Sequence, residues 1–446
     1  MPQNKSVIVA GGGWAGLAAS IELVRHQTPV LLLESAKQLG GRARSVNANG
    51  LTIDNGQHLL LGAYESTLDI LRTIGVVEDH VIKRQALALH WLDIENRPVG
   101  IKAAKLPAPL HLAWALLRAS GLSLRERLSA LRFGHAMLKK GFHIAEDCSV
   151  LCLLQSYKQS PRLITAIWEP LCLSALNTHT HEASAQIFLR TLGDAFRHTQ
   201  SGSDLLLTRR ELGAILPQPA MDYIETHGGN VHLGQRVTEL VIEDGAIQGI
   251  KVDKEEFPCS QLILATPHLV TQRLLQPHAQ LNPLSEQLGQ LEDRPICTVY
   301  LQYPSGTQLD RDMQGALGTL SQWIFDHRIY GQDGLMAVVI SADGEHMDWD
   351  NEVLCTKVRQ ELARLFPHWQ PALSHHVIRE KRATFASCVN VNQYRPQAQT
   401  GVRGLWLAGD YTKVGLPATL EGAVRSGLHS ARGILRAPDL GTYDRK

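Results

Sequence analysis

Three glycines near the start of the chain have the spacing that brings a protein backbone against a pyrophosphate. Gly11, Gly13 and Gly16 form a Gly-x-Gly-x-x-Gly pattern. In such a pattern the first glycine permits a tight turn, the second leaves room for the phosphates and the third lets a helix pack closely. Glu34 follows after the length of one helix, where a carboxylate accepts hydrogen bonds from a ribose hydroxyl and disfavours a 2′-phosphate. These residues predict a dinucleotide site that does not take NADP.

A strand, a helix and a second strand must hold these residues in place. The apolar run 7–10 predicts a buried strand, and the run 30–33 predicts a second one. The residues between them follow a helical pattern, and the free N–H groups at the start of that helix suit a phosphate. This context makes the glycine pattern specific, against the alternative of a Gly-rich turn without a ligand. We also assign Trp14, Ala15 and Ser35 to the cofactor site.

A second region with paired glycines is expected to return to the same ligand. Gly41 and Arg42 suit a loop whose guanidinium binds a phosphate with two donors, the alternative being a solvated basic turn. Asp54 is expected to cap a turn. The polar residues after it are assigned to the cofactor site: Asn55, Gly56, Gln57 and His58. Because imidazole titrates near neutral pH, His58 is also the candidate proton donor, although a histidine that only positions the cofactor, or a core histidine, gives the same pattern.

The C-terminal region contains an apolar strand that ends in a glycine and an acid. Gly409 and Asp410 follow the run 404–408, at the strand end where open α/β sheets bind ligands. Asp410 can hydrogen-bond a polyol chain, and a helix that starts near Thr419 and Leu420 directs N–H groups at an electron-rich ring edge. A flavin has both a ribityl chain and such an edge. Together with the N-terminal pattern, these residues predict FAD as the cofactor.

Composition and charge exclude several classes of protein. The chain has 446 residues, of which 44% are hydrophobic and 20% charged, as in ordinary globular proteins. A net charge of +1 without a long basic run argues against a nucleic-acid partner. The seven cysteines are scattered without a Cys-x-x-Cys pair, which argues against a metal site and favours a reducing compartment. Few residues precede the first strand, so we expect no signal peptide and a cytoplasmic protein.

The order of the patterns predicts an α/β fold of two domains. The FAD-binding domain, with a Rossmann-type parallel sheet, is expected to be discontinuous and to comprise residues 1–80, 228–275 and 395–446. An inserted α+β substrate domain, with an antiparallel sheet and helices, is expected from residues 81–227 and 276–394. Short strands over 230–267 mark the return to the first domain, and Val237 among them is assigned to the cofactor site.

The helical part of the substrate domain, residues 106–200, begins with leucine-rich helices. Basic residues are interspersed with the leucines of 106–140. Such helices either lie in a membrane interface or pack their apolar face against the core of their own domain. No uninterrupted apolar stretch has the length needed to span a membrane.

These stretches resemble the superfamily of FAD-dependent amine oxidases and carotenoid desaturases. The resemblance rests on the glycine pattern with Gly40-Gly41-Arg42, on residues 54–58 and on residues 407–413, which are similar to the phytoene desaturase type. Within the superfamily, the run DNGQHLLLGAY at 54–64 and residues 382–385 look most like the bacterial hydroxysqualene dehydroxylases.

The resemblance implies a reductive dehydroxylation of hydroxysqualene, an allylic alcohol, to squalene in hopanoid biosynthesis. The hydroxyl group would leave with a proton, and reduced flavin would supply a hydride to the resulting cation. It also implies an apolar tunnel for a polyprenoid and a peripheral position on the inner face of the cytoplasmic membrane. The sequence contains no second nucleotide pattern, so the electron donor is unknown.

Three other functions fit parts of the same pattern. A carotenoid desaturase is also a flavin enzyme that acts on a polyprenoid, but it removes hydride rather than donating it. An amine oxidase usually has an aromatic residue near the start of the last helix, whereas residues 417–420 are Pro, Ala, Thr and Leu. A non-catalytic flavoprotein that carries an isoprenoid is the third alternative.

Overall fold

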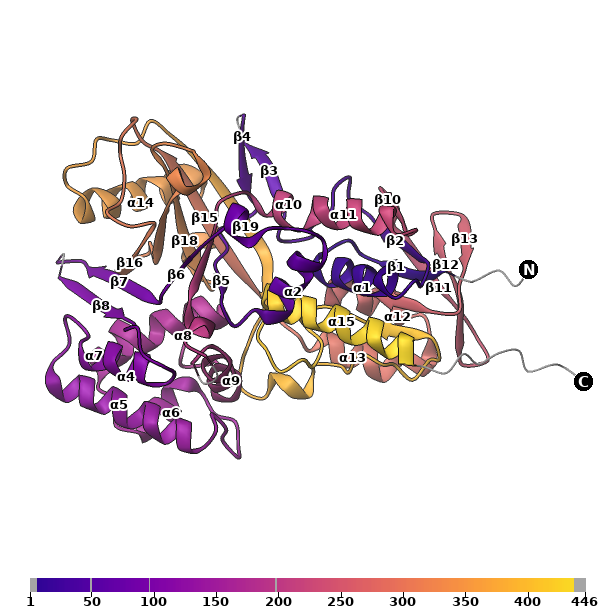
Figure 1. Ribbon diagram of the computed structural model, residues 1–446, viewed down its shortest axis with the longest axis horizontal. Coiled ribbons are helices and arrows are strands. Elements are labelled where there is room, and N and C mark those ends of the chain that lie inside the picture. The colour runs from indigo at the N-terminus through magenta and orange to yellow at the C-terminus, as the bar shows by residue number, and fades with distance from the viewer. Residues whose placement is uncertain (1–5, 49, 96, 197–198, 437–446) are drawn as a thin grey trace, which may run out of the picture.

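The computed structural model describes residues 6–48, 50–95, 97–196 and 199–436, and its elements form two parts (Figure 1). One part surrounds a parallel sheet and contains both the first described strand and the last described helix of the chain. The other part combines a larger sheet with a group of helices. The predicted α/β fold with a second, α+β part is confirmed.

The first part is organised around a five-stranded sheet in which all neighbouring strands are parallel. Val7 and Val9 belong to the apolar cluster on one face, and Ile8 and Ala10 belong to the cluster on the other, as the two-residue period of a strand requires. Both faces are therefore covered, which is the usual state of a parallel sheet. The order of the strands is β10 (Asn230–Leu233), β2 (Val30–Glu34), β1 (Val7–Ala10), β14 (Leu262–Leu264) and β20 (Leu405–Leu407).

Different elements cover the two faces of this sheet (Figure 1). One face carries helices: α1 (Trp14–Arg25), α15 (Leu420–Arg436) and α11 (Pro217–Thr226), with α2 (Glu65–Thr73) against α15. The other face packs against a small antiparallel sheet and two helices: β11 (Val237–Glu243), β12 (Ala246–Val252), β13 (Glu255–Pro258), α12 (His268–Leu275) and α13 (Asn282–Gly289).

The second part contains a seven-stranded sheet. One face packs on α14 (Asn351–Leu365) and the other contributes to the main apolar cluster. Its neighbouring strands are antiparallel, as the sequence predicted, except for β7 and β16, which are parallel. No tight turn joins these distant strands, and their direction is therefore free. The strand order is β19 (Ser374–Phe385), β15 (Asp293–Gln302), β18 (Leu335–Ser341), β17 (Trp323–Asp326), β16 (Met313–Leu317), β7 (Ala88–Asp93) and β8 (Pro98–Lys102).

A group of helices packs near the face of the seven-stranded sheet that α14 does not cover. The Trp323 indole N–H of β17 donates to the Ser174 hydroxyl of α8, which joins the helices to the sheet. The helices are α4 (Leu110–Leu117), α5 (Leu124–Lys139), α6 (Val150–Ser156), α7 (Pro161–Leu163), α8 (Glu169–Leu176) and α9 (Ala185–Phe196), with a π-helical turn (Ile164–Trp168) before α8. Among the described residues, none of the helices combines the length and apolarity needed to cross a membrane.

Shorter elements connect the two parts. The strands are β3 (Ser45–Ala48) paired with β4 (Leu51–Asp54), and β5 (Leu60–Leu61), β9 (Leu205–Thr208) and β6 (Ile82–Gln85) in a third small sheet. The short helices are α3 (Glu78–Val81), α10 (Leu212–Ile215) and the 3-10 turns Ser201–Ser203, Ala279–Leu281, His327–Tyr330, Glu345–Met347 and Val391–Gln393.

Helix α11 lies on the other side of the predicted domain boundary. Ala220 and Ile224 of α11 belong to the same apolar cluster as Leu17 and Ile21 of α1. The helix therefore packs with the parallel sheet, although the sequence placed it within the segment 81–227. That boundary is wrong because the apolar face of α11 finds its partner in a helix from the start of the chain, which periodicity does not reveal.

The close contact between α1 and α15 predicts that one methyl group added at Gly427 destabilises the protein. A Cβ at Gly427 would lie 2.0 Å from the Ala15 carbonyl oxygen, so the backbones could not keep their distance. We expect Gly427→Ala to lower the free energy of unfolding by about 2 kcal/mol through overpacking, measured by thermal or chemical unfolding. The matched control is Gly134→Ala in α5, where a Cβ meets nothing within 4 Å. The control should be neutral or stabilising by about 1 kcal/mol, and equal losses in both variants would contradict the argument.

Candidate cofactor site and active site

The N-terminus of α1 is built to accept a phosphate. Gly13 precedes the helix without a side-chain cap, and no acidic residue lies in the first turn. A Cβ at Gly13 would meet nothing closer than the Gly41 Cα at 3.9 Å, whereas a Cβ at Gly16 would lie 1.9 Å from the Gly11 carbonyl oxygen. Gly13 is thus open and Gly16 is a close packing point, in agreement with the roles expected from the sequence. The open N–H groups and the helix dipole favour an anion here.

The first two side chains of α1 do not reach into this space. The Trp14 indole is buried, and its N–H donates to the Ala43 carbonyl oxygen at 3.3 Å. The Ala15 side chain is buried in the apolar cluster that α1 shares with α15. Trp14 and Ala15 therefore offer backbone N–H groups to a ligand rather than side chains.

The Glu34 carboxylate lies at the carboxyl end of β2 and is buried. Its Oε2 accepts from the Gly12 N–H at 2.7 Å, and its Oε1 accepts from the Ala36 N–H at 2.7 Å and from the Ser35 hydroxyl at 3.2 Å. Glu34 therefore holds the glycine loop against β2. Each carboxylate oxygen can accept more than one hydrogen bond, so Glu34 can accept a further one from a ribose hydroxyl.

Val237 comes to the same edge from a distant part of the sequence. The Gln235 N–H donates to the Glu34 carbonyl oxygen at 2.8 Å, and Val237 begins β11 two residues later. Val237 is also buried. The segment that leads into β11 therefore runs beside the end of β2, close to the carboxylate expected to bind the ribose.

Arg42 joins both ends of the chain at the carboxyl edge of the sheet. Its Nη2 donates to Asp410 Oδ1 at 2.7 Å, and its Nη1 donates to the Ala383 carbonyl oxygen at 2.8 Å. Burial opposes the charge, but the Asp410 and Glu380 carboxylates outweigh it and raise the pKa of Arg42 above its usual range. A permanent cation therefore lies between the phosphate-binding turn and the acid expected to bind the polyol chain.

The loop that carries Asp410 is held by a residue that the sequence analysis missed. The fully buried Arg395 guanidinium donates to the carbonyl oxygens of Asp410, Tyr411 and Thr412, and it lies 4.8 Å from the centre of the Phe385 ring. Burial lowers the pKa of Arg395 to about 10. An isolated arginine before a proline has no motif that would single it out, and only the fold shows that it clamps this loop.

Tyr411 and Gly409 complete the clamp. The Tyr411 hydroxyl pairs with Thr271 Oγ1 at 3.0 Å, which links the loop to α12. Gly409 has a φ of +152°, and a Cβ there would lie 2.4 Å from the Tyr411 ring. The Gly409 N–H donates to the Ser426 hydroxyl of α15 at 2.8 Å. The loop after β20 is therefore fixed from three sides.

The start of α15 is formed by the two predicted residues Thr419 and Leu420. The Thr419 hydroxyl accepts from the Gly422 N–H at 3.0 Å, and Leu420 is the first helical residue. The buried Glu421 accepts from the backbone N–H groups of Ser66 and Thr67, which attaches this helix end to α2. The helix end is thus rigidly placed beside the Asp410 loop.

The segment 55–58 lies between the two parts of the molecule. The Asn55 side-chain amide donates to the Arg42 carbonyl oxygen and to Glu380 Oε2 at 3.0 Å. The Gln57 side-chain oxygen Oε1 pairs with His327 Nε2 at 3.1 Å, and the Gln57 side-chain amide nitrogen donates to the Tyr330 hydroxyl. These bonds tie the segment both to the cofactor-binding loop and to the substrate part.

The surroundings of His58 favour one of its two proposed roles. Its Nδ1 lies 2.8 Å from the Gly56 carbonyl oxygen, so the ring proton is on Nδ1. Burial, reinforced by the charge of Arg42, lowers the pKa of His58 to about 4. At neutral pH the ring is uncharged and its Nε2 accepts hydrogen bonds. This state suits a positioning residue better than the proton donor that the sequence suggested.

Asp54 is a buried cap, as expected. Its Oδ1 accepts from the Leu212 N–H at 2.9 Å and from the Ser45 hydroxyl, and its carbonyl oxygen accepts from the Tyr300 hydroxyl at 2.9 Å. Burial raises the pKa of Asp54 to about 7, partly opposed by these hydrogen bonds. Asp54 therefore attaches α10 and β15 to the strand that leads into 55–58.

Thr298 is a buried hydroxyl without a partner among the described residues. Its Oγ1 lies 3.8 Å from the position a Cβ would take at Gly56. Its strand neighbours on the same face are Tyr300, which bonds Asp54, and Ile296, which pairs in register with Glu380. Thr298 therefore lies beneath the 54–58 segment, on a face that is otherwise mainly apolar. Nothing in the sequence distinguished it from an ordinary strand threonine.

Taken together, the groups at this edge fit FAD. Free N–H groups at α1 match a pyrophosphate, Glu34 matches a ribose, Asp410 matches a ribityl chain, and the α15 N-terminus matches the edge of the ring. The structure brings every predicted site residue to this edge or to the loops around it. The individual contacts of these residues with the cofactor remain predictions.

A family model described as flavin containing amine oxidoreductase matches residues 14–435. This chain belongs to that family. The match extends from the first turn of α1 to the end of α15, so it includes both ends of the cofactor site. The predicted cofactor, FAD, is confirmed, and the protein is an FAD-dependent oxidoreductase of this family.

Several curated relatives align over nearly the whole chain. The hydroxysqualene dehydroxylase of Rhodopseudomonas palustris is 29% identical and covers 97% of this chain and 99% of the relative. That of Zymomonas mobilis is 25% identical, with 95% and 97% covered. The 15-cis-phytoene desaturase of Glycine max is 24% identical and covers 98% of this chain and 80% of the relative. The resemblance stated from the sequence is thereby confirmed.

Solved structures show the same fold at lower identity. An oxidoreductase from Methanosarcina mazei has a TM-score of 0.75 at 16% identity, with 96% of this chain and 99% of that chain covered. A triple mutant of putrescine oxidase has a TM-score of 0.76 at 15% identity, with 97% and 98% covered. These likenesses support the architecture alone.

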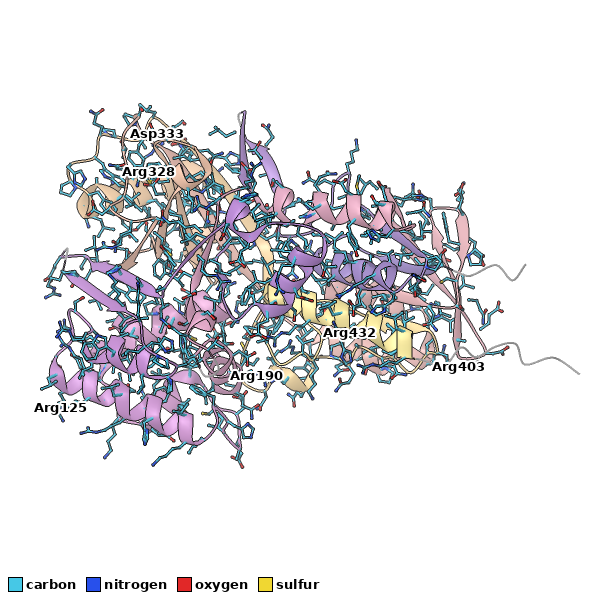
Figure 2. The ribbon with its side chains drawn as sticks, viewed as in Figure 1. Arg125, Arg190, Arg328, Asp333, Arg403 and Arg432 are labelled. Atoms are coloured by element: carbon cyan, nitrogen blue, oxygen red, sulfur yellow. The ribbon has the colours of Figure 1, made fainter. Side chains whose placement is uncertain are left out.

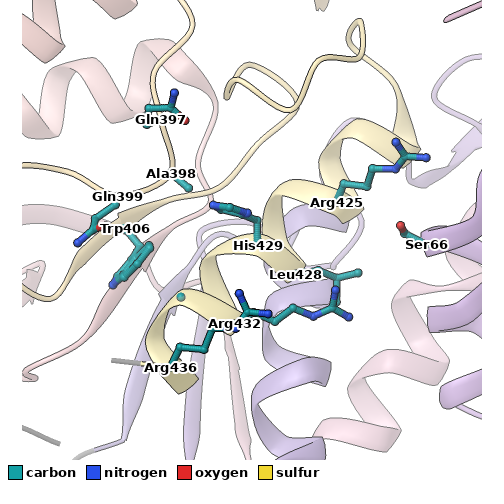
Figure 3. A pocket seen from close by; sticks show the side chains of 11 residues that line it. Ser66, Gln397, Ala398, Gln399, Trp406, Arg425, Leu428, His429, Arg432 and Arg436 are labelled. Atoms are coloured by element: carbon teal, nitrogen blue, oxygen red, sulfur yellow. The ribbon is translucent and has the colours of Figure 1, made fainter. Parts of the chain in front are cut away.

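A groove of about 930 Å³ lies along the outer face of α15 and is separate from this site (Figure 3). Two of the three arginines that line it already have partners: Arg425 pairs with Glu421 and Asp194, and Arg432 pairs with Glu22. The groove is therefore a solvated surface lined by ion pairs rather than a part of the cofactor site.

The clamp around Asp410 predicts that Arg395 controls retention of the cofactor. Arg395→Leu leaves three backbone carbonyls without their charged donor, and we expect a loss of about 3 kcal/mol in stability. We also expect the flavin absorbance per protein to fall after gel filtration, because Asp410 is no longer held. The control is Arg403→Gln, whose guanidinium makes a long bond to the Asp244 carbonyl oxygen at the surface (Figure 2). Full flavin retention in Arg395→Leu would refute the clamp.

The raised pKa of Asp54 predicts a pH dependence of stability. The folded carboxyl keeps its proton up to about pH 7, whereas the unfolded carboxyl, with the ordinary value of 3.8, releases it much earlier. The free energy of unfolding therefore falls as the pH rises from the pKa of the unfolded carboxyl to that of the folded one, by up to about 1.4 kcal/mol per pH unit.

Asp54→Asn keeps an acceptor for the Leu212 N–H but does not titrate, so the variant isolates this effect. The difference in unfolding free energy between wild type and variant should shift in favour of the variant between pH 4 and pH 7. Buried histidines such as His58 affect both proteins equally and cancel in the difference. A difference that is constant with pH would show that Asp54 is ionised in the folded state.

Proposed function

We propose that the protein converts hydroxysqualene to squalene by reductive dehydroxylation. The observation that carries the proposal is the similarity to hydroxysqualene dehydroxylases over 95% or more of the chain, at 25–29% identity. In the balanced reaction the carbon–oxygen bond breaks, the oxygen leaves as water with a proton, and a hydride forms the new carbon–hydrogen bond. Bound FAD in its reduced form supplies the two electrons as a hydride.

In this proposal the apolar side of the substrate part encloses the polyprenoid chain. The sheet face directed toward the helices is lined by apolar side chains, which join the same cluster as the cores of α5 and α9. They include Trp91, Trp323, Phe325, Ala337 and Val339. Burial of hydrocarbon in such a lining is favourable, and the lining also excludes water from a developing allylic cation.

Polar groups next to this lining are few and specific. Thr298 supplies a hydroxyl with no protein partner among the described residues, and an unsatisfied buried hydroxyl is stabilised when a ligand or water bonds it. The neutral Nε2 of His58 is an acceptor at the segment that joins both parts. In the proposal these groups orient the alcohol end of the substrate and the flavin, while the apolar walls hold the chain.

The alternative of carotenoid desaturation is supported by the similarity to 15-cis-phytoene desaturase, which is nearly as extensive. It requires the same apolar enclosure with hydride transfer in the opposite direction. The amine oxidase alternative receives less support, since the residues before and at the start of α15 are Pro417, Ala418, Thr419 and Leu420 and none is aromatic.

An anaerobic experiment separates these reactions. The purified protein, with FAD confirmed by absorbance, is reduced and mixed with hydroxysqualene. We expect the absorbance of oxidised flavin to return and squalene to be found in the lipid extract in equal amount. Squalene itself, which lacks the hydroxyl group, serves as the matched control and should leave the flavin reduced.

The reverse mixture tests the alternatives. Two results together would establish a desaturase and overturn the proposal. Phytoene would bleach the oxidised flavin, and hydroxysqualene would leave the reduced flavin unchanged. Bleaching by an amine would establish an amine oxidase. A flavin that responds to none of these compounds would support the isoprenoid carrier.

A further inference from the structure

Helix α4 buries its polar side chain and exposes apolar ones, which is the reverse of a helix on a water-exposed surface. His111 is its only polar side chain, yet it is 0% exposed and pairs with the Ser203 hydroxyl at 3.1 Å. Leu110 is 58% exposed and Trp114 is 46% exposed, and Leu117 continues the same face. Helices that meet water place apolar residues inward and polar residues outward. The outer face of α4 is therefore suited to an apolar neighbour.

Helix α5 and the approach to α4 extend this surface. Leu124 is 64% exposed, and Leu128 follows one turn later. Six of the twelve strongly exposed large apolar residues among the described residues lie within 106–128. Contiguous apolar patches of this kind are rare on monomeric soluble proteins and mark interaction sites. We call this surface the α4–α5 face: Leu106, Leu110, Trp114, Leu117, Leu124 and Leu128.

Cations are frequent in the segment that carries the α4–α5 face. The segment 102–140 contains eight Lys and Arg residues and a single acidic residue, Glu126, whereas the whole chain has a net charge of +1. The remainder of the chain is therefore negative overall. The Arg118 guanidinium lies 5.7 Å from the centre of the Trp114 ring, so charge and aromatic surface meet at one point.

The face lies at an extremity of the molecule. Arg125 of α5 is found at the edge of the structure, at the end opposite Arg403 of the cofactor part (Figure 2). A flat partner could thus contact α4 and α5 without meeting the parallel sheet. The buried faces of the same helices, with Ala115, Phe133 and Met137, remain packed in the core.

We propose that the α4–α5 face binds the surface of an anionic lipid bilayer, with both helices lying in the interface. Leucines and a tryptophan among Lys and Arg residues are the composition of helices that lie in such an interface. The negative headgroups complement the local positive charge, and long basic side chains can extend to them while their stems contact the apolar surface. The inference concerns the partner of this face and does not require hydroxysqualene as substrate.

The test is binding of the full-length, FAD-loaded protein to vesicles by sedimentation. We expect binding to vesicles of equal parts phosphatidylcholine and phosphatidylglycerol, and at least about 10-fold weaker binding to phosphatidylcholine alone. The double variant Trp114→Glu, Leu124→Glu should bind the mixed vesicles about 10-fold more weakly or worse than wild type. The matched control is Leu373→Glu, which changes a side chain that is 69% exposed but lies outside the face, and it should bind like wild type.

A second measurement reports insertion and does not depend on a charged substitution. Lipids brominated in their acyl chains should quench part of the tryptophan fluorescence of the wild type, and Trp114→Leu should abolish that part while binding persists. Arg118→Gln combined with Arg125→Gln should reduce the preference for phosphatidylglycerol. Flavin absorbance and melting temperature confirm that each variant is folded.

Three results would overturn the proposal. The first is a wild type that does not bind mixed vesicles, and the second is a Trp114→Glu, Leu124→Glu variant that binds like wild type. The third is a wild type that forms dimers without binding vesicles and becomes monomeric in this variant, because a second copy of the chain would then cover the face. None of these results depends on turnover, so they are distinguishable from a failure of the proposed function.

Discussion

The ion pair between Arg42 and Asp410 is the constraint on which the site depends. It joins a loop near the start of the chain to a loop near its end, and the second donor of Arg42 reaches Ala383 at the end of β19. Three segments therefore converge on one guanidinium. The Asp410 side chain is 8% exposed and the Arg42 side chain 38%, so the carboxylate withdrawn from water has its charge compensated by a guanidinium at the edge of the solvent. The phosphate-binding turn of α1 and the clamp formed by Arg395 complete the same construction from either side.

The two parts of the molecule divide the chemistry. The parallel sheet presents polar groups along one edge, where helix ends and carboxylates match the polar portions of FAD. The seven-stranded sheet presents a largely apolar face, with Thr298 as a hydroxyl that lacks a protein partner among the described residues. The segment 55–58 connects them through hydrogen bonds to Arg42 and Glu380 on one side and to His327 on the other. Hydride chemistry at the junction would thus be shielded from water by side chains of the substrate part.

The same architecture is found in proteins named for amines and in proteins named for polyprenoids, so the fold does not decide the substrate. The distinction lies in side chains around the flavin and in the approach to it. In this chain the residues at 417–420 are not aromatic, and helices α4 and α5 of the substrate part expose leucine and tryptophan among cations. Both features agree with an apolar substrate, and the second is the basis for the proposed bilayer contact.

The sequence alone determined the cofactor, the parallel sheet and the residues at its edge. These depend on local spacing: Gly11, Gly13 and Gly16 act within one turn, and Glu34 and Asp410 each follow a strand directly. Only the tertiary structure decided that Arg395 clamps the Asp410 loop, that α11 belongs with α1, and that the His58 ring is neutral. It also decided which face of α4 meets solvent, since leucine spacing alone fits a core-facing helix as well as an interfacial one. The physical reason is that burial and hydrogen bonding between distant segments set these properties, and periodicity along the chain carries no record of which segments meet.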